Sequence, residues 1–440
     1  MDLAQTYQAT LQQLYKKLPM FTRIGAAAYK PNLDNTLLLC EKLKNPQSKF
    51  KSIHIAGTNG KGSCSALLAA AFQQSGYKTA LYTSPHIVDF RERIKINGVD
   101  ISKQYVVDFV KNHEKLIEDI QPSFFELTVA MAFTYFAEQS VDIAIIETGL
   151  GGLLDSTNII TPEVSVITNI SNDHAYLLGE TLQEIALQKA GIIKNKVPVV
   201  IGETQEALQK IFITTAIMHE STVFFADNTY SAVYSEMKAG KQWLKIIDKS
   251  TMQLMNICTD LMGNYQSKNI ITVLKTLDVM KNKGWDLSGC SIENVFANTK
   301  TLIGFKGRFD IVHQQPTIIF DVSHNEAGIN ALFEQIATLT YQTLYIITGF
   351  VKDKEIQEIL QRFPKQANYY FVEAAIPRAL PKEILYEMAT AIGLKGEQAP
   401  TIQEGLQSAM SRASANDVIL VTGSFFILEE AYHFIENNIH

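Results

Sequence analysis

One short segment constrains this chain more than any other: an apolar run that ends in a glycine-rich turn and continues into a helical pattern. The run 52–56 precedes the loop 57–63, and a segment rich in alanine and leucine follows as far as Phe72. A strand, a glycine loop and a helix N-terminus together form a phosphate cradle, because backbone N–H groups and the helix dipole face anionic oxygens. Lys61 adds a full positive charge. The segment therefore predicts a phosphate-binding site.

The spacing within this loop differs from that of the usual P-loop. Its first glycine comes late relative to Lys61, and Gly62 separates the lysine from the hydroxyl of Ser63. This spacing argues against a generic kinase or GTPase. The simpler alternative, a structural turn without a ligand, is disfavoured by the strand before the loop and the helix after it.

Composition and charge indicate a soluble protein of two or three domains. The chain has 440 residues, of which 46% are hydrophobic, and its formal net charge of −6 argues against general nucleic-acid binding. Its four cysteines lie far apart without metal-type spacing, as is usual in a reducing compartment. The N-terminus lacks a signal-peptide pattern, and no apolar run approaches the length of about 18 residues that a membrane span needs. We therefore expect a cytoplasmic protein that binds neither nucleic acid nor membrane.

Alternating strand and helix patterns predict an α/β fold in the first half of the chain. Unbroken apolar runs are typical of parallel strands buried on both faces. The predicted strands are residues 52–56, 79–83, 141–147, 164–169 and 197–201, and the predicted helices are residues 104–119, 126–139 and 182–190. Residues 221–254 differ, because short β-like pieces surround polar turns there and predict a small, more antiparallel excursion.

A second α/β series begins near residue 300. Its predicted strands are residues 317–321, 344–348, 369–372 and 418–422, and its predicted helices are residues 326–337, 354–363, 381–391 and 425–437. Polarity rises near residue 299 and predicts a boundary there. We expect an N-terminal phosphate-binding domain over residues 1–298 and a smaller C-terminal α/β domain over residues 299–440.

Polar side chains follow several predicted strands at the points where those strands end. Glu147, His174 and Ser84 all lie at or just beyond such ends. Ligands gather at the carboxyl ends of strands in α/β sheets. Beside a triphosphate, a carboxylate, an imidazole and a hydroxyl could hold Mg²⁺. The alternative is that Glu147 caps a loop and that His174 is an ordinary loop residue.

Other candidates remain open on spacing alone. Lys189 ends a predicted helix, so spacing favours a solvated lysine that complements the helix dipole. In the second half, Asp321 and His324 follow a predicted strand, and Arg308 lies earlier in the chain. These three residues could close over a nucleotide and clamp its γ-phosphate. The alternative is a surface arginine beside a helix cap.

Taken in order, these segments resemble the folylpolyglutamate synthase and dihydrofolate synthase family, a branch of the Mur-type ATP-dependent amide ligases. The resemblance covers nearly the whole chain. Its motifs are residues 56–63, 83–86, 90–94, 124–126, 147–158, 170–174, 189–194, 263–269, 307–309, 321–325 and 422–424. It implies a Mur-ligase-like α/β fold, in which a P-loop ATPase domain with a mostly parallel sheet precedes a smaller glutamate-ligase domain.

The resemblance also implies roles for single residues. The ATP phosphate site would comprise Gly57, Thr58, Asn59, Gly60, Lys61, Gly62 and Ser63. Further nucleotide contacts would be Asn269, Arg308, Asp321 and His324. The loops around a pterin would contain Phe124, Asp155 and Asn158. The Mg²⁺ ligands would be Ser84, Glu147 and His174. Lys189 would be carboxylated by CO₂, and its carbamate would help to hold a second Mg²⁺, so the resemblance contradicts the solvated lysine that spacing favours.

The implied activity is the ATP-driven addition of L-glutamate to dihydropteroate, to the γ-carboxylate of a reduced folate, or to both, through an acyl phosphate. Lys61 would stabilise charge, while His174 and Lys189 would position metal. The resemblance implies ATP, Mg²⁺ and small-molecule substrates, leaves a K⁺ requirement open, and implies a monomer. Three alternatives are a sibling ligase that acts on a cell-wall precursor, a P-loop kinase, and a nucleotide-binding regulator without catalysis. Segments 90–94 and 124–126 favour folate.

The chain departs from the family pattern at a few positions. Gln188 stands where glutamate is usual, Tyr265 replaces a frequent histidine, and Glu326 stands where proline is common. Residues 25–30 do not match the expected N-terminal substrate loop. None of these departures removes a proposed metal or phosphate ligand.

Overall fold

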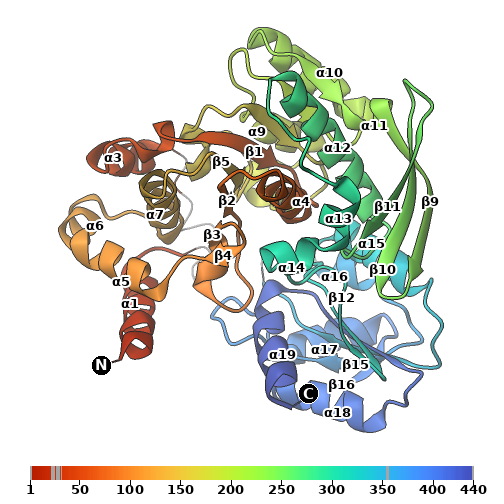
Figure 1. Ribbon diagram of the computed structural model, residues 1–440. Coiled ribbons are helices and arrows are strands. Elements are labelled where there is room, and N and C mark those ends of the chain that lie inside the picture. The colour runs from red at the N-terminus through yellow and green to blue at the C-terminus, as the bar shows by residue number, and fades with distance from the viewer. Residues whose placement is uncertain (1, 21–24, 26–29, 31, 353–355, 439–440) are drawn as a thin grey trace.

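Three β-sheets organise the computed structural model, which describes residues 2–20, 25, 30, 32–352 and 356–438. Figure 1 shows a large sheet in the upper part of the molecule, a second large sheet in the lower part, and a small antiparallel sheet at the right-hand edge. The N-terminal segment that departs from the family pattern falls largely outside the described residues.

The first sheet has eight strands in the order β4-β3-β2-β5-β1-β6-β7-β8. Its strands are β1 (Lys51–Ala56), β2 (Thr79–Tyr82), β3 (Ile94–Ile96), β4 (Val99–Asp100), β5 (Ile143–Glu147), β6 (Val164–Ile167), β7 (Val199–Ile201) and β8 (Val223–Phe225). All pairings are parallel except those of β3 with β2 and β4. Every residue of β2, β5 and β6 is buried, which accounts for their unbroken apolar runs.

Helices cover both faces of this sheet. The first face packs on α4 (Lys61–Gln74), α12 (Gln266–Asn282), α13 (Ile292–Ala297) and α14 (Thr299–Ile303). The second face packs on α1 (Leu3–Lys17), α3 (Asp34–Lys42), α5 (Lys103–Asn112), α6 (Glu114–Ile120), α7 (Phe124–Glu138), α9 (Leu182–Ala190) and α10 (Glu206–Met218). With both faces covered, ligands can reach the sheet only at its edges and strand ends.

Two expectations about this half need correction. The helix predicted over residues 104–119 is two helices, α5 and α6. One non-helical residue, His113, separates α5 from α6, and its Nδ1 lies 2.8 Å from the carbonyl oxygen of Phe109, to which its backbone N–H also donates. In the excursion predicted over residues 221–254, β8 instead pairs in parallel with β7. The antiparallel sheet comprises β9 (Tyr230–Lys238), β10 (Lys241–Asp248) and β11 (Leu254–Thr259), and α11 (Ala226–Thr229) precedes it.

The second large sheet has six strands in the order β12-β13-β17-β14-β15-β16, and only β12 runs antiparallel to its neighbour. Its strands are β12 (Asp310–Gln314), β13 (Thr317–Phe320), β14 (Leu344–Thr348), β15 (Asn368–Phe371), β16 (Lys395–Gln398) and β17 (Val418–Thr422). Its helices are α15 (Glu326–Ile336), α16 (Ile356–Leu360), α17 (Lys382–Ala391), α18 (Ile402–Arg412) and α19 (Phe425–Asn438). The start of the helix predicted over residues 354–363 lies outside the described residues.

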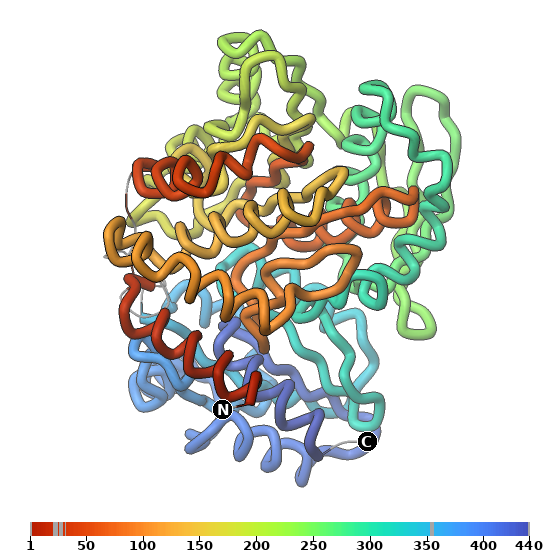
Figure 2. Tube along the Cα trace, turned by 60° about the vertical axis from the view of Figure 1, so that its left-hand side comes forward, coloured from red at the N-terminus to blue at the C-terminus, as the bar shows by residue number. Residues whose placement is uncertain are grey.

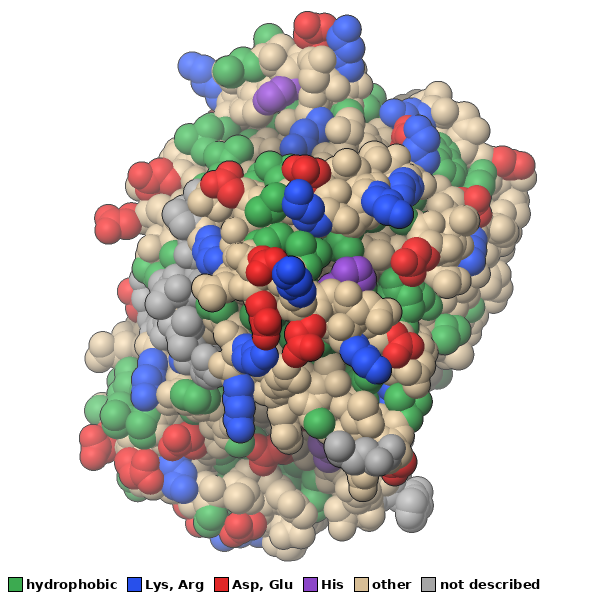
Figure 3. All heavy atoms as spheres, turned by 90° about the vertical axis from the view of Figure 1, so that its left-hand side faces the viewer, with side chains coloured by type: hydrophobic (Ala, Val, Ile, Leu, Met, Phe, Trp, Pro, Cys, Tyr) green, Lys and Arg blue, Asp and Glu red, His purple; other side chains and the backbone are tan. Residues whose placement is uncertain are grey.

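Helix α14 and a short loop directly precede the second large sheet. Ile303 of α14 belongs to the core beneath the first sheet, and β12 opens the second sheet at Asp310. The boundary expected at residue 299 stays a prediction, and we propose from this packing that it lies after α14. Figure 2 shows both chain ends in the lower part of the molecule. Figure 3 shows acidic and basic side chains intermingled on one face. No helix within the described ranges is long and apolar enough to cross a membrane.

Candidate active site

A cavity of about 510 Å³ lies where strand-end loops of the two large sheets meet. All seven residues of the loop 57–63 line it, as do most of the other predicted site residues. Those others are Ser84, Phe124, Glu147, Asp155, His174, Lys189, Asn269, Arg308 and His324. Two predicted site residues, Asp321 and Asn158, do not line the cavity.

Close packing explains the glycines of the phosphate loop. Gly57 has a φ of 146°, and a Cβ atom there would lie 1.8 Å from Oγ1 of Thr168. Gly60 has a φ of 85°, and its Cβ would lie 2.2 Å from Oδ1 of Asn269. Side chains at these positions would force the loop away from β6 and α12. Gly60 is the N-cap of α4 and has no side-chain cap, so the first N–H groups of this helix remain available to an anion.

Two lysines share one carbonyl of this loop. Nζ of Lys61 lies 3.1 Å from the Gly57 oxygen and 3.2 Å from the Thr58 oxygen, and Nζ of Lys189 lies 2.8 Å from the same Gly57 oxygen. Lys189 is only 4% exposed, so the expectation of a solvated lysine is wrong. Burial, reinforced by the positive charge of Lys61, lowers the pKa of Lys189 to about 7. Its amine therefore reaches the neutral form near physiological pH.

Glu147 places a buried carboxylate opposite these lysines. It ends β5, is 4% exposed, and accepts a hydrogen bond of 3.2 Å from the backbone N–H of Ser84. Burial raises the pKa of Glu147, and the charge of Lys61 opposes that rise. The described residues contain no cluster of three His, Cys, Asp or Glu side chains that could hold a metal ion alone. Glu147, with Ser84 and His174 in the same cavity, nevertheless fits Mg²⁺. This ion takes one or two carboxylates and completes its shell with water and phosphate oxygens.

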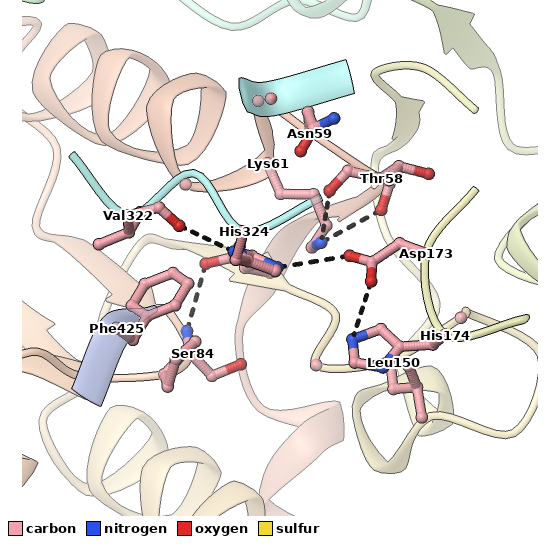
Figure 4. Close-up of a pocket in the computed structure, with 18 of the residues that line it drawn as sticks. Thr58, Asn59, Lys61, Ser84, Leu150, Asp173, His174, Val322, His324 and Phe425 are labelled. Atoms are coloured by element: carbon pink, nitrogen blue, oxygen red, sulfur yellow. Dashed lines mark hydrogen bonds and ion pairs between the residues drawn. The ribbon is translucent and has the colours of Figure 1, made fainter. Parts of the chain in front are cut away.

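Asp173 lies between two imidazoles from opposite sides of the cavity (Figure 4). Its Oδ1 is 3.7 Å from Nε2 of His174, and its Oδ2 is 3.4 Å from Nε2 of His324. Nδ1 of His324 must carry a proton, because it lies 2.8 Å from the carbonyl oxygen of Val322. Sequence reasoning missed Asp173, although its place beside His174 after a strand end could have identified it.

The second sheet touches the phosphate loop directly through Asn325. Its Nδ2 donates to Oδ1 of Asn59 at 3.1 Å and to Oδ2 of Asp173 at 3.2 Å. Asn325 is also the N-cap of α15 and accepts from the N–H of Gly328 at 2.8 Å. One amide thus joins the start of a C-terminal helix to the loop that would hold phosphate.

Asp321 does not line the cavity, and its expected nucleotide contact stays a prediction. Its Oδ2 accepts from the N–H of Phe309 at 2.8 Å and from the hydroxyl of Tyr265 at 3.2 Å, and its Oδ1 accepts from the N–H of Ser323 at 2.8 Å. The bond from Phe309 holds the chain directly after Arg308, which does line the cavity. The Arg308 guanidinium lies 5.3 Å from the ring centre of Phe425. Asp321 therefore positions the arginine.

The remaining predicted residues form the wall farther from the phosphate loop. Phe124 opens α7, and the guanidinium of Arg93 lies 5.7 Å from the centre of its ring. Asp155 is buried and accepts from the N–H groups of Leu150 at 2.8 Å and Thr157 at 3.0 Å. Sequence reasoning did not select Arg93, although it lies within the segment 90–94. The charges of Arg93 and Asp155 and the aromatic face of Phe124 together suit a ligand with a flat polar ring.

Asn158 lies behind this wall, not in it. Its Nδ2 donates to the carbonyls of Leu153 at 2.9 Å and Gly191 at 3.0 Å. These bonds tie the loop after β5 to the end of α9, and the contact expected from Asn158 to substrate stays a prediction. That end of α9 carries Lys189, so the two loops are held together.

Comparisons with known proteins agree with this geometry. The chain matches the Mur ligase middle domain over residues 55–277 and the glutamate ligase domain of Mur ligases over residues 307–425. It is 32% identical over 419 residues to the dihydrofolate synthase/folylpolyglutamate synthase of Bacillus subtilis, covering 91% of this chain and 94% of that protein.

Solved structures show the same likeness. The folylpolyglutamate synthase of Mycobacterium tuberculosis in complex with ADP superposes with a TM-score of 0.87 at 26% identity, covering 98% of each chain. The E. coli FolC structure in complex with DHPP and ADP gives a TM-score of 0.84 at 25% identity, covering 99% of this chain and 98% of that one. On its sequence, its two matched domains and its fold, this chain belongs to the dihydrofolate synthase/folylpolyglutamate synthase family of Mur-type ligases.

Proposed function

We propose that this protein is an ATP-dependent ligase that joins L-glutamate to dihydropteroate, to the γ-carboxylate of a reduced folate, or to both. One observation carries the proposal: a single cavity holds a phosphate loop with two lysines, a buried carboxylate, and a wall of Phe124, Arg93 and Asp155. The names of the relatives and the ADP and DHPP in their structures support the same activity.

The first step is phosphoryl transfer to the substrate carboxylate. A carboxylate oxygen attacks the γ-phosphorus of ATP, and the bond from that phosphorus to the β,γ-bridging oxygen breaks. ADP departs, and the substrate becomes an acyl phosphate. The N–H groups of the phosphate loop and Lys61 bind the transferring group, and Arg308 adds a cation from the second sheet. Bound Mg²⁺ would neutralise phosphate charge, with Glu147, Ser84 and His174 placed to hold it or its water.

The second step forms the amide. The uncharged amine of L-glutamate attacks the acyl carbon, phosphate leaves with one oxygen of the original carboxylate, and the nitrogen loses a proton. An acyl phosphate hydrolyses in water, so contact between the two sheets must exclude solvent. The bonds of Asn325 to Asn59 and Asp173 provide part of that contact.

Lys189 fits the carboxylation that the resemblance implies. Carbamate formation needs a neutral amine, and a pKa of about 7 supplies one. The product is an anion beside Lys61, suited to a second Mg²⁺. With wild-type protein under ¹³CO₂ we expect a carbamate ¹³C resonance that is absent from Lys189→Met.

An assay with labelled L-glutamate, ATP and Mg²⁺, run on dihydropteroate and on tetrahydrofolate in parallel, tests the proposal. Label in both acceptors establishes both activities, and label in one assigns a single activity. Label in neither, from folded protein, contradicts the folate proposal and directs attention to a cell-wall acceptor. Hydroxylamine should trap the acyl phosphate as a hydroxamate, which a kinase would not yield. Reactions with and without K⁺ settle the K⁺ requirement.

A further inference from the structure

A buried histidine outside the cavity contacts the loop that carries Asp155. His54 lies on β1, is fully buried, and has its Nε2 2.8 Å from Oγ1 of Thr157. The same Thr157 oxygen lies 2.5 Å from Oδ1 of Asp155. Asp155 lines the cavity, whereas His54 and Thr157 do not. The three side chains form a path from the central strand to the cavity wall.

The direction of these hydrogen bonds follows from what each group can donate. Burial raises the pKa of Asp155, but hydrogen bonds from Thr157 and from backbone N–H groups oppose that rise and favour the ionised carboxylate. An ionised carboxylate only accepts, so the Thr157 hydroxyl donates its single proton to Asp155. The Thr157 oxygen is then an acceptor, and Nε2 of His54 must be the donor. Nδ1 of His54 is buried and has no hydrogen-bond partner among the described residues, consistent with a ring nitrogen that carries no proton. Burial lowers the pKa of His54 to about 3, so the ring stays neutral at physiological pH.

We infer that His54 is a positioning residue for the acceptor substrate, acting through Thr157 to fix the Asp155 carboxylate. The inference rests on the proposed function, in which the wall that contains Asp155 contacts the acceptor substrate. With Oδ1 engaged by Thr157, the carboxylate cannot rotate freely, and the loop 148–159 is anchored to the sheet.

The anchor point matters for the chemistry. β1 leads directly into the phosphate loop at Gly57, so His54 ties the acceptor wall to the strand that positions the phosphates. The reacting carboxylate must lie within about 3–3.5 Å of the γ-phosphorus and in line with the bridging oxygen. A shared rigid strand sets that distance better than two independent loops would.

A matched pair of variants tests the hydrogen bond. His54→Gln keeps an N–H donor near the position of Nε2, whereas His54→Met has similar length and no donor. We expect His54→Met to raise KM for the pteroate or folate acceptor roughly fivefold, the usual effect of one lost hydrogen bond, with KM for ATP unchanged. His54→Gln should remain within about twofold of wild type.

A neighbouring buried serine provides the control. Ser165 lies beside His54 in the register of β1 and β6 and donates to the carbonyl of Ile192 at 2.7 Å. Ser165→Ala removes a buried hydrogen bond of the same sheet without touching the path to Asp155. It should lower thermal stability and leave both KM values unchanged. In a Thr157→Val background, His54→Met should add no further rise in acceptor KM, because the path is already cut.

The tautomer gives a readout independent of activity. In ¹⁵N-histidine spectra of the full chain, His54 should carry its proton on Nε2 and show no titration between pH 5.5 and 8, a range that lies about two units or more above its lowered pKa. A proton on Nδ1, or equal acceptor KM for the His54→Met and His54→Gln variants, overturns the inference. Failure of wild-type protein to incorporate glutamate into any folate would instead contradict the proposed function.

Discussion

The two sides of the cavity use charged and polar residues differently. On the first sheet, the amines of Lys61 and Lys189 bond to loop carbonyls, and Glu147 accepts one backbone N–H, so these groups retain capacity for a ligand. On the second sheet, Asp321 accepts three hydrogen bonds, from Phe309, Tyr265 and Ser323, and does not line the cavity. We therefore propose that the first side supplies most of the groups that bind phosphate, and that the second side adds Arg308 and the residues that hold it in place.

The largest expected effect comes from Lys61. Lys61→Met removes the cation from the phosphate loop and should lower kcat about 10²–10³-fold, the usual effect of losing one charge-stabilising donor. Lys268→Met is the control, because Lys268 also lines the cavity but is exposed and paired with Glu203 at 2.7 Å. The control should lose less than about threefold. Equal losses of kcat in Lys61→Met and Lys268→Met would show that Lys61 has no special role in binding phosphate.

Glu147 should come next. Glu147→Gln keeps the shape of the side chain but removes the negative charge, so the Mg²⁺ concentration for half-maximal rate should rise, and the rate at saturation should fall roughly 10²-fold. Glu203→Gln, at a carboxylate of the same cavity farther out, serves as the comparison. An unchanged Mg²⁺ requirement in Glu147→Gln would exclude it as a metal ligand. Titration of initial rate against Mg²⁺ provides the measurement.

Asp321 should have a smaller effect through positioning. In the wild type, two backbone N–H groups donate to the Asp321 carboxylate. In Asp321→Asn, the side-chain NH₂ group would face one of these donors, so the chain around Arg308 should shift. We expect a loss in kcat/KM of roughly tenfold and a loss in unfolding free energy of about 1–3 kcal/mol. If kcat fell as far as in Lys61→Met with no change in stability, Asp321 would belong with the groups that bind phosphate instead.

Lys189 should contribute a pH dependence of stability. Its folded pKa of about 7 lies below the unfolded value of about 10.4, so between these values the unfolded chain binds the extra proton and stability rises with pH. Below pH 7 both states are protonated and the destabilisation is fully present. In CO₂-free urea unfolding between pH 7 and 9, the wild type should gain about 1.4 kcal/mol per pH unit over Lys189→Met. Parallel curves would show that the amine is not buried as a neutral group.

Local patterns predicted the parts of the fold that depend on local physics. Apolar runs and the glycine or polar residues that end them predict the strand, glycine loop and helix around Lys61. They also predict the polar residues at the ends of β5 and β6. β16 was missed, because all four of its residues are exposed and leave no apolar run. The break at His113 involves a single residue, which periodicity does not detect.

The site residues that spacing misjudged depend on contacts between distant parts of the chain. Lys189 is buried because α9 packs against the loop at Gly57, far away in sequence. Asp321 does not line the cavity, and its carboxylate accepts hydrogen bonds from Phe309 and Tyr265. The resemblance identified Lys189 as special, but neither it nor spacing anticipated Asp173 between two imidazoles or the path from His54 to Asp155.

Transfer of the acceptor's own oxygen tests the central claim most directly. Dihydropteroate or folate labelled with ¹⁸O in the reacting carboxylate would be incubated with ATP, Mg²⁺ and L-glutamate, and the released phosphate analysed by mass spectrometry. Formation of an acyl phosphate predicts one ¹⁸O in each phosphate, in proportion to the amide formed. Amide product accompanied by unlabelled phosphate would show that the carboxylate is not phosphorylated and would contradict the assignment of phosphoryl transfer to this cavity.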